Sequence, residues 1–262
     1  MRKLLLAAGL AATGFYFYNK NQTNVPRVRE VLLASDQLKN DLRITQISDF
    51  HNHKNMNPKE IRKKVEEYDP HFIAFTGDLI SENTTDFIHA IALVKTLVDT
   101  GIPCYYVYGN HEFHNPNRRE FFQTLQALGV KQLNNETVYL EEHDLYLTGL
   151  TWAVSTEQYK ETVQKQHSYH VVLCHSPSDI LPTGGQNADL ILCGHTHGGQ
   201  VRLPGIGAIV IPTQGFFGAY DKGLFQLGDA ILYIDSGLGN TRLDLRAFNP
   251  IQFSNVTINV HR

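Results

Sequence analysis

LILCGHTHGG, residues 190–199, places two histidines, His195 and His197, in a glycine-rich loop directly after an apolar run. Such a run followed by glycine is typical of a buried β-strand. In an extended chain, residues two apart point to the same side, so both imidazoles would face one ligand. In a tight loop at a strand end, the two rings would instead diverge toward two neighbouring ions. The glycines remove side chains that would block close approach of the backbone to a ligand.

Four other short stretches carry similar chemistry, and each follows an apolar run that resembles a strand. They are Asp49-Phe50-His51, Gly77-Asp78, Gly109-Asn110-His111 and Cys174-His175. Loops at the ends of neighbouring strands in an α/β protein commonly carry its ligands. We therefore expect these stretches to meet in one site.

Helix signals lie between the strands, such as Asn57-Pro58-Lys59-Glu60, with a capping residue followed by proline at the first helical position. The sequence predicts an α/β protein, a β-sandwich flanked by helices, with one catalytic domain at residues 41–262. Expected strands are 42–47, 72–76, 104–108, 130–133, 138–140, 145–147, 169–173, 190–193, 230–234 and 252–260. Expected helices begin at Pro58 and cover about 84–98, 118–128 and 155–166.

The composition limits the possible functions. A chain of 262 residues with a formal net charge of −3 lacks the overall basic character of many nucleic-acid-binding proteins, so no such surface is expected. Three cysteines, Cys104, Cys174 and Cys193, lie in predicted strands without a CxxC spacing. They predict buried thiols rather than a disulfide framework.

Residues 1–20 differ from the rest of the chain. An uncharged stretch from Leu4 to Tyr18 follows Arg2-Lys3, and it is shorter than the roughly 20 residues that span a bilayer as a helix. It predicts a membrane anchor or a signal segment, and its aromatic end favours an uncleaved single-pass anchor in the cell membrane. We expect an extracytoplasmic catalytic domain; secretion and a cytoplasm-facing domain are the alternatives. Residues 21–40 read as a polar tether with a possible edge strand near Val31.

The motif residues supply four imidazoles, two carboxylates and one amide oxygen. This mixture suits borderline divalent ions such as Mn, Fe, Zn or Co, and seven ligands exceed the needs of one tetrahedral ion. Two ions that share a bridging carboxylate would use all seven, and their excess positive charge suits a phosphoester. The candidate ligands are Asp49, His51, Asp78, Asn110, His175, His195 and His197.

The ordered set DxH, GD, GNH, H and GHxH resembles the calcineurin-like metallophosphoesterase superfamily. The resemblance covers nearly everything after residue 41 and implies hydrolysis by a metal-bound hydroxide. It further implies that Asp78 bridges the two ions and that His111 protonates the leaving oxygen or stabilises the transition state. By the same resemblance, one ion would be held by Asp49, His51 and His197, and the other by Asn110, His175 and His195.

The longer stretch 194–204, with Ser236-Gly237-Leu238-Gly239-Asn240, resembles a bacterial membrane-associated phosphodiesterase branch of that superfamily. Its members act on UDP-diacylglucosamine or related phosphodiesters, so the resemblance implies a phosphoester substrate and makes a lipid-linked one a candidate. The chain departs from a common family pattern at Ser81, where several members have an aspartate that orients the acid histidine. Either Glu82 or a backbone group replaces that aspartate, or His111 works with less support.

Further residues are candidates for contact with the substrate. Arg202, Arg242 and Arg246 offer guanidinium groups that can bind phosphate oxygens, although ordinary surface ion pairs are the more common role of such residues. Residues 216–220, Phe-Phe-Gly-Ala-Tyr, form either an exposed apolar lip or part of the core.

The sequence therefore predicts a membrane-anchored, dinuclear-metal phosphodiesterase. The alternatives are a phosphomonoesterase or protein phosphatase on the same scaffold, and an inactive binding module.

Overall fold

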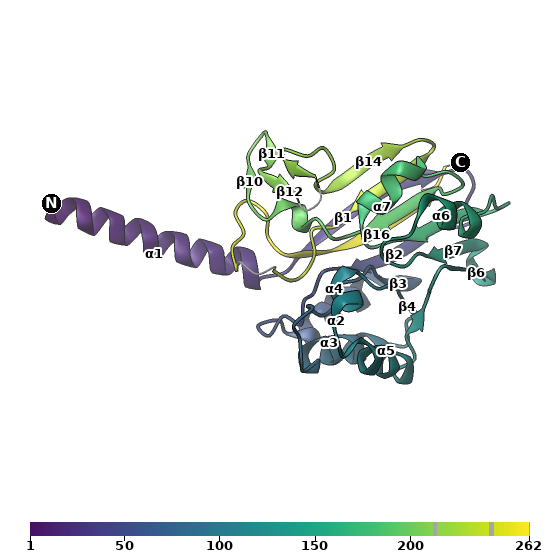
Figure 1. Cartoon of the computed structure of the whole chain (residues 1–262), viewed down its shortest axis with the longest axis horizontal. Coiled ribbons are helices and arrows are strands. Elements are labelled where there is room, and N and C mark those ends of the chain that lie inside the picture. The colour runs from purple at the N-terminus through teal and green to yellow at the C-terminus, as the bar shows by residue number, and fades with distance from the viewer. Residues whose placement is uncertain (212–213, 241–243, 262) are drawn as a thin grey trace.

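Two six-stranded sheets form the centre of the protein, and helices lie on their outer faces (Figure 1). The computed structural model describes residues 1–211, 214–240 and 244–261. The order of the first sheet is β1-β16-β2-β3-β4-β5, and that of the second is β14-β15-β9-β8-β7-β6. The predicted α/β sandwich is confirmed.

The first sheet contains three adjacent parallel strands whose following loops carry predicted site residues. These are β2 (Leu42–Ile47), β3 (Phe72–Phe75) and β4 (Cys104–Tyr106). The other strands of this sheet are β1 (Arg27–Ser35), β5 (Lys131–Gln132) and β16 (Gln252–Val260). All predicted strands of this sheet are present, with ends that differ by a few residues.

The second sheet supplies the remaining site loops from the parallel strands β8 (Tyr169–Leu173) and β9 (Leu190–Cys193). Its other members are β6 (Glu136–Leu140), β7 (Leu145–Gly149), β14 (Gly223–Leu227) and β15 (Ala230–Ile234). Near-continuous apolar strands are typical of sheets covered on both faces, which explains why β3, β8 and β9 are wholly buried.

Three apolar clusters hold the layers together. One lies between the sheets and includes Ile44, Leu147 and Leu192. A second packs the first sheet against α2 (Pro58–Tyr68), α3 (Ile88–Val98) and α5 (Arg118–Ala127). A third packs the second sheet against α6 (Thr156–Thr162) and α7 (Pro177–Ile180), and the three cysteines are buried thiols as predicted.

Residues 21–40 form regular elements rather than a polar tether, and the edge strand expected near Val31 is present. The helix α1 runs from Arg2 to Asn24, and β1 then pairs with β16 along its whole length as an edge strand. The last turns of α1 bind the domain, because Asn19 Oδ1 accepts from the Arg246 N–H and Gln22 Oε1 accepts from the Asn249 N–H. Within the described residues, no helix combines the length and apolar character needed to cross a bilayer, so the expected single-pass anchor is not supported.

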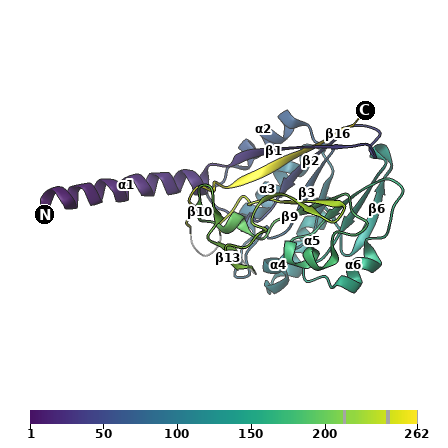
Figure 2. The same ribbon diagram turned by 90° about the horizontal axis from the view of Figure 1, so that it is seen from above.

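Short elements that the sequence did not predict follow the GHTHGG loop. They are two small hairpins, made by β10 (Arg202–Leu203) with β11 (Gly207–Ala208) and by β12 (Val210–Ile211) with β13 (Gly215–Phe216). Figures 1 and 2 both place these hairpins at the end of the molecule from which α1 projects. Three 3₁₀ turns, Glu141–His143, Leu181–Thr183 and His197–Gly199, and the short helix α4 (Asn110–His114) complete the described elements.

Candidate metal centre

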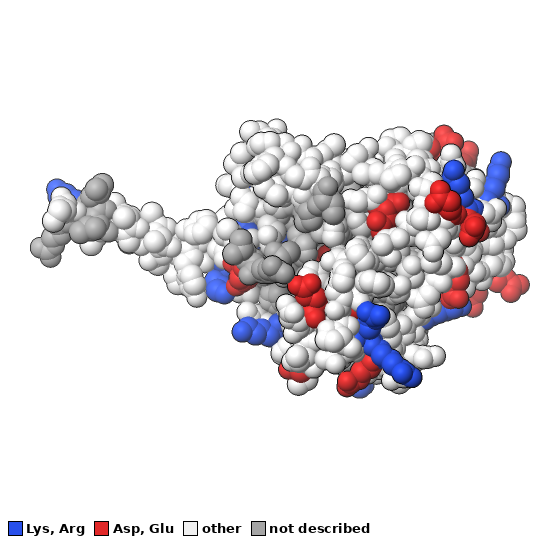
Figure 3. Space-filling model, viewed as in Figure 1, with Lys and Arg blue, Asp and Glu red and all other residues white. Residues whose placement is uncertain are grey.

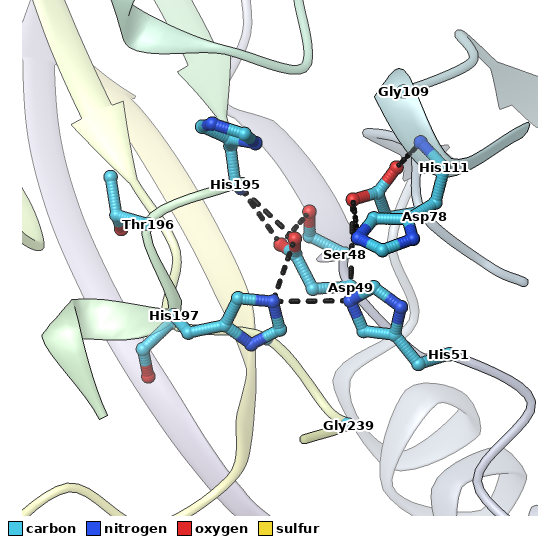
Figure 4. Close-up of polar contacts among 12 residues, drawn as sticks. Ser48, Asp49, His51, Asp78, Gly109, His111, His195, Thr196, His197 and Gly239 are labelled. Atoms are coloured by element: carbon cyan, nitrogen blue, oxygen red, sulfur yellow. Dashed lines mark hydrogen bonds and ion pairs between the residues drawn. The ribbon is translucent and has the colours of Figure 1, made fainter. Parts of the chain in front are cut away.

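Loops from five strands meet at one end of the sandwich and bring together all seven candidate ligands and His111. Figure 4 shows His111 with five of these ligands, Asp49, His51, Asp78, His195 and His197. Asp49 and His51 follow β2, Asp78 follows β3, and Asn110 and His111 begin α4 after β4. His175 follows β8, and His195 and His197 follow β9. Residues more than 140 positions apart in the chain thus become neighbours, such as His51 and His197.

The first group of donors consists of Asp49, His51 and His197. The Nε2 atoms of His51 and His197 are 3.1 Å apart, and the latter is 3.5 Å from Asp49 Oδ1. These donor atoms lie close enough together to hold one metal ion.

The second group gathers around His175 Nε2. This nitrogen is 3.1 Å from His195 Nδ1, 3.1 Å from Asn110 Oδ1 and 3.1 Å from Asp78 Oδ2. The same Asp78 oxygen is 4.0 Å from His51 Nε2 in the first group. Asp78 therefore lies between the two groups, where a bridging ligand would be.

The spacing of these atoms fits metal coordination. Ligands about 2.1 Å from an ion, separated by 90–109° at the ion, lie about 3.0–3.4 Å from one another. The closest pairs of imidazole nitrogens match this range at 3.1 Å. Since the carboxylates and imidazoles are hard-to-borderline ligands without a thiolate, the donor set suits divalent ions of the Mn, Fe, Zn or Co kind.

The electrostatics of the groups also favour cations. Burial raises the pKa of Asp49 to about 7, with the Asp78 charge adding to the effect. Burial opposes ionisation of Asp78 as well, but His175 and His51 outweigh it and hold the pKa of that carboxyl well below its usual range. Burial lowers the pKa of His51 to about 3 and that of His195 to about 4, so both imidazoles are neutral and able to bind a metal.

Burial also opposes protonation of His175, yet the neighbouring charge of Asp78 dominates and raises the pKa of His175 to about 10. A protonated His175 therefore balances the Asp78 charge in this geometry. A divalent cation bound between these two residues would replace that proton, since metal binding to imidazole releases protons.

Five of the seven candidate ligands have left-handed backbone conformations. The φ angles are 51° for Asp49, 51° for His51, 53° for Asp78, 72° for His195 and 49° for His197. Such conformations cost of order 1–3 kcal/mol at a residue with a side chain and tend to cluster at functional sites. The fold therefore holds these ligands in positions that their own backbone preferences oppose.

Glycines make the close approach of the loops possible, as the sequence predicted. A Cβ at Gly194 would lie 1.8 Å from Ser48 Oγ and 2.3 Å from Asp49 Oδ2. A Cβ at Gly109 would lie 2.2 Å from Asp78 Oδ1. Side chains at these two positions would displace a carboxylate in each group.

Glu112 holds two of the site loops together, a role that sequence reasoning missed. Its side chain is buried and accepts from the backbone N–H groups of Asp78 and Gly109, both at 2.9 Å. It also accepts from Leu79 at 2.5 Å and from Ile80 at 3.2 Å. The sequence did offer a signal for this role, because Glu112 is an acidic residue that directly follows the Gly109-Asn110-His111 motif.

Replacing Glu112 by glutamine should destabilise the protein by at least about 2 kcal/mol. The amide nitrogen cannot accept a hydrogen bond, so at least one pair of buried N–H groups loses its partner, at about 1–3 kcal/mol for each group. Denaturant unfolding measures the change. The matched control is Glu66→Gln, at an exposed position of α2 where the carboxylate accepts a hydrogen bond from Arg62. Equal unfolding free energies for the two variants would contradict this role.

His111 lies beside the two groups with its Nε2 3.9 Å from Asp78 Oδ2. The backbone N–H of Glu82 donates to its Nδ1 at 3.1 Å. Of the alternatives for replacing the missing aspartate, the backbone group is therefore the one that orients the ring. Ser81 instead contacts the neighbouring ligand, with its Oγ 3.0 Å from His51 Nδ1.

The three candidate arginines have different surroundings. Arg202 is partly buried and forms an ion pair with Asp221 at 2.6 Å. Arg246 is fully buried and contacts the far nitrogen of His197, with 3.2 Å between Nη2 and Nδ1, so its guanidinium does not face a substrate. Arg242 lies outside the described residues.

The fold and the donor set define a metal-binding protein of the phosphoesterase type. The sequence profile of the calcineurin-like phosphoesterases matches residues 42–199, and the chain belongs to this family. It is 28% identical to the uncharacterized metallophosphoesterase YkuE of Bacillus subtilis, over 92% of this chain and 89% of that protein. It is also 26% identical to the phosphodiesterase YaeI of Escherichia coli, over 66% and 65% of the two chains.

Solved structures share the fold at low sequence identity. The protein TT1561 of Thermus thermophilus superposes with a TM-score of 0.52 at 11% identity, covering 75% of this chain and 90% of that one. A 5′-nucleotidase precursor from the same organism gives 0.53 at 13% identity, covering 84% and 54%. Proteins of this family usually bind divalent metals, and the His and Asp groups described above offer the donors for such ions.

Proposed function

We propose that this protein hydrolyses phosphodiesters with two divalent ions. One would be held by Asp49, His51 and His197, the other by Asn110, His175 and His195, and Asp78 would bridge them. The observation that carries the proposal is the convergence of these seven donors into two adjoining groups, in which the closest donor atoms are 3.1–3.5 Å apart. Bound ions would lower the pKa of water and neutralise charge on the phosphoryl oxygens.

The protein's own residues would orient the substrate and donate a proton to it. Because the Glu82 N–H donates to His111 Nδ1, the proton of the neutral ring is on Nε2, the nitrogen nearer Asp78. His111 would therefore donate from Nε2 to an oxygen of the phosphoryl or leaving group. The contact of Asp78 Oδ1 with the His111 N–H, at 2.9 Å, fixes the start of α4 so that this ring stays beside the metal groups.

The test compares phosphodiester and phosphomonoester hydrolysis by the metal-loaded protein. The similarity to the phosphodiesterase YaeI supports the diester, so we expect faster turnover of a soluble chromogenic diester than of the matching monoester. Faster monoester turnover would favour the phosphomonoesterase or protein phosphatase alternative. Absence of hydrolysis of either compound by protein that retains two ions would favour the binding module.

We further propose that the substrate is lipid-linked and is reached at a membrane surface. Phe216 is 75% exposed and Phe217 is 60% exposed on the second small hairpin and just beyond it, so these rings form a lip rather than part of the core. Ile206 and Phe248 are also exposed apolar residues. Figure 3 shows a largely uncharged surface over the small hairpins, whereas acidic and basic side chains lie near the point where α1 leaves the domain. Apolar and aromatic side chains of this kind settle at the membrane interface.

Replacing Phe217 by alanine should lower the turnover of a lipid-linked diester several-fold while leaving a soluble chromogenic diester unaffected. The ring is exposed, so its loss removes contact with lipid without opening a cavity in the core. Steady-state kinetics on both substrates measure the effect, with Leu32→Ala on the exposed edge strand β1 as the control. Equal losses on both substrates would count against a lipid-binding lip.

A further inference from the structure

A pocket of about 400 Å³ lies between β1 and β14, the edge strands of the two sheets. None of the seven proposed metal ligands lines it. Four of its nine lining residues are cations, Arg27, Arg29, Arg202 and Lys222, and none of the nine is an aspartate or glutamate. This composition is unusual at a place where two sheets face each other.

Several parts of the chain bring these cations together. Arg27 and Arg29 are two residues apart on β1, so both project from the same face of the strand. In the parallel register they lie opposite Gln252 and Ser254 of β16. Arg202 begins β10 and Lys222 directly precedes β14, which supply the other walls.

The positive charge of the pocket is mostly uncompensated. Within the described residues, Arg202 alone of the four has a carboxylate at ion-pair distance, that of Asp221 at 2.6 Å. Arg27 and Lys222 instead donate to neutral amide oxygens, those of Asn21 at 3.2 Å and Asn249 at 2.9 Å. Burial, and after it the neighbouring Arg202 charge, lower the pKa of Lys222 to about 8, although the charges of Asp235 and Asp221 oppose the shift.

We propose that this pocket binds a phosphate group of an anionic ligand, separately from the metal centre. Guanidinium groups match phosphate oxygens in bidentate geometry, and a phosphate accepts more donors than a single carboxylate. Pockets that hold small ligands measure about 300–1,000 Å³, so a pocket of 400 Å³ has room for a phosphate with its attached alcohol.

The pocket is connected to the loop that carries His197. Arg202 Nη1 donates to the Gly198 carbonyl at 3.1 Å. Asn249, which accepts from Lys222, donates to the His197 carbonyl at 2.7 Å. A bound phosphate would therefore stabilise the conformation of this loop. Arg27 also lies just beyond α1, which places the pocket near the end of the molecule where that helix projects (Figure 2).

The test measures binding of inorganic phosphate to the full chain by calorimetry, first with the metal-free protein in the presence of a chelator and then with the metal-loaded protein. In chelator we expect one site, weakened at least tenfold by the double replacement Arg27→Gln and Arg29→Gln. The control is Arg62→Gln with Lys63→Gln, which removes the same charge from two positions on α2 that pair with Glu66 and Glu67. Hydrolysis of a soluble chromogenic diester should be unchanged in both variants. Equal phosphate affinity in the Arg27/Arg29 variant and the wild type, or no binding by the wild type, would overturn the proposal.

A second measurement identifies the source of the phosphate. Wild type and both double variants are sedimented with phosphatidylcholine vesicles and with vesicles that also contain phosphatidylglycerol. If the Arg27/Arg29 variant alone loses retention on the anionic vesicles, the pocket binds a lipid headgroup. If retention is unchanged while affinity for free phosphate falls, the ligand is a soluble phosphate compound. Both results support the pocket, and calorimetry decides whether it exists.

Discussion

Replacing Asp78 by asparagine should lower phosphoester turnover by about 10³-fold or more and reduce the metal content of the purified protein. Asp78 is buried, and its Oδ2 lies 3.1 Å from His175 and 4.0 Å from His51, one member of each donor group. Asparagine removes the charge that both ions would share. Losing about 4 kcal/mol of transition-state stabilisation corresponds to about 10³ in rate.

The asparagine change keeps the local structure, which makes the result interpretable. Asp78 Oδ1 accepts from the His111 N–H at 2.9 Å, and an amide oxygen can still accept there. Metal content by elemental analysis and steady-state kinetics provide the two readouts. Asp99→Asn, at an exposed carboxylate paired with Lys95 on α3, is the control. Unchanged metal content together with unchanged turnover would contradict a bridging role for Asp78.

The site loops could be predicted from the sequence because each short motif directly follows an apolar run. Parallel strands in a layered α/β fold end at the same edge, so residues as distant as Asp49 and His197 were expected to meet. The structure places their side-chain atoms 3.5 Å apart. The periodicity of strands and helices carried this information locally, and the layered fold turned it into a three-dimensional site.

Other features depend on contacts that no local pattern reports. The apolar residues near Val31 indicated an edge strand, but β1 also carries Arg27, Arg29 and Glu30, so its alternation is weak and pairing with β16 defines its length. The strands of the two small hairpins are two residues long, which is too short for a periodic signal. Arg246 was predicted to contact the substrate because the sequence does not show which guanidinium groups become buried.

Replacing Arg246 by methionine should destabilise the metal-free protein by at least about 2 kcal/mol, because buried carbonyl groups would lose their hydrogen-bond donor. Arg246 is 0% exposed. Its Nη2 donates to the carbonyls of Ser236 and Gly239, each at 2.7 Å, and its Nε donates to Asn240 Oδ1 at 3.1 Å. Methionine fills much of the volume but leaves these acceptors without a donor, at about 1–3 kcal/mol for each buried group.

The same substitution should weaken metal binding at the group that contains His197, because Arg246 Nη2 contacts the Nδ1 of that ring at 3.2 Å and limits its rotation. Denaturant unfolding in chelator measures stability, and metal titration measures affinity. Arg62→Met on exposed α2 should change stability by no more than about 0.5 kcal/mol. Arg246→Lys keeps the charge without the planar fork, so a weakened metal affinity in this variant would assign the effect to the geometry of the guanidinium. Wild-type stability of Arg246→Met would show that these buried hydrogen bonds do not hold the loop behind His197.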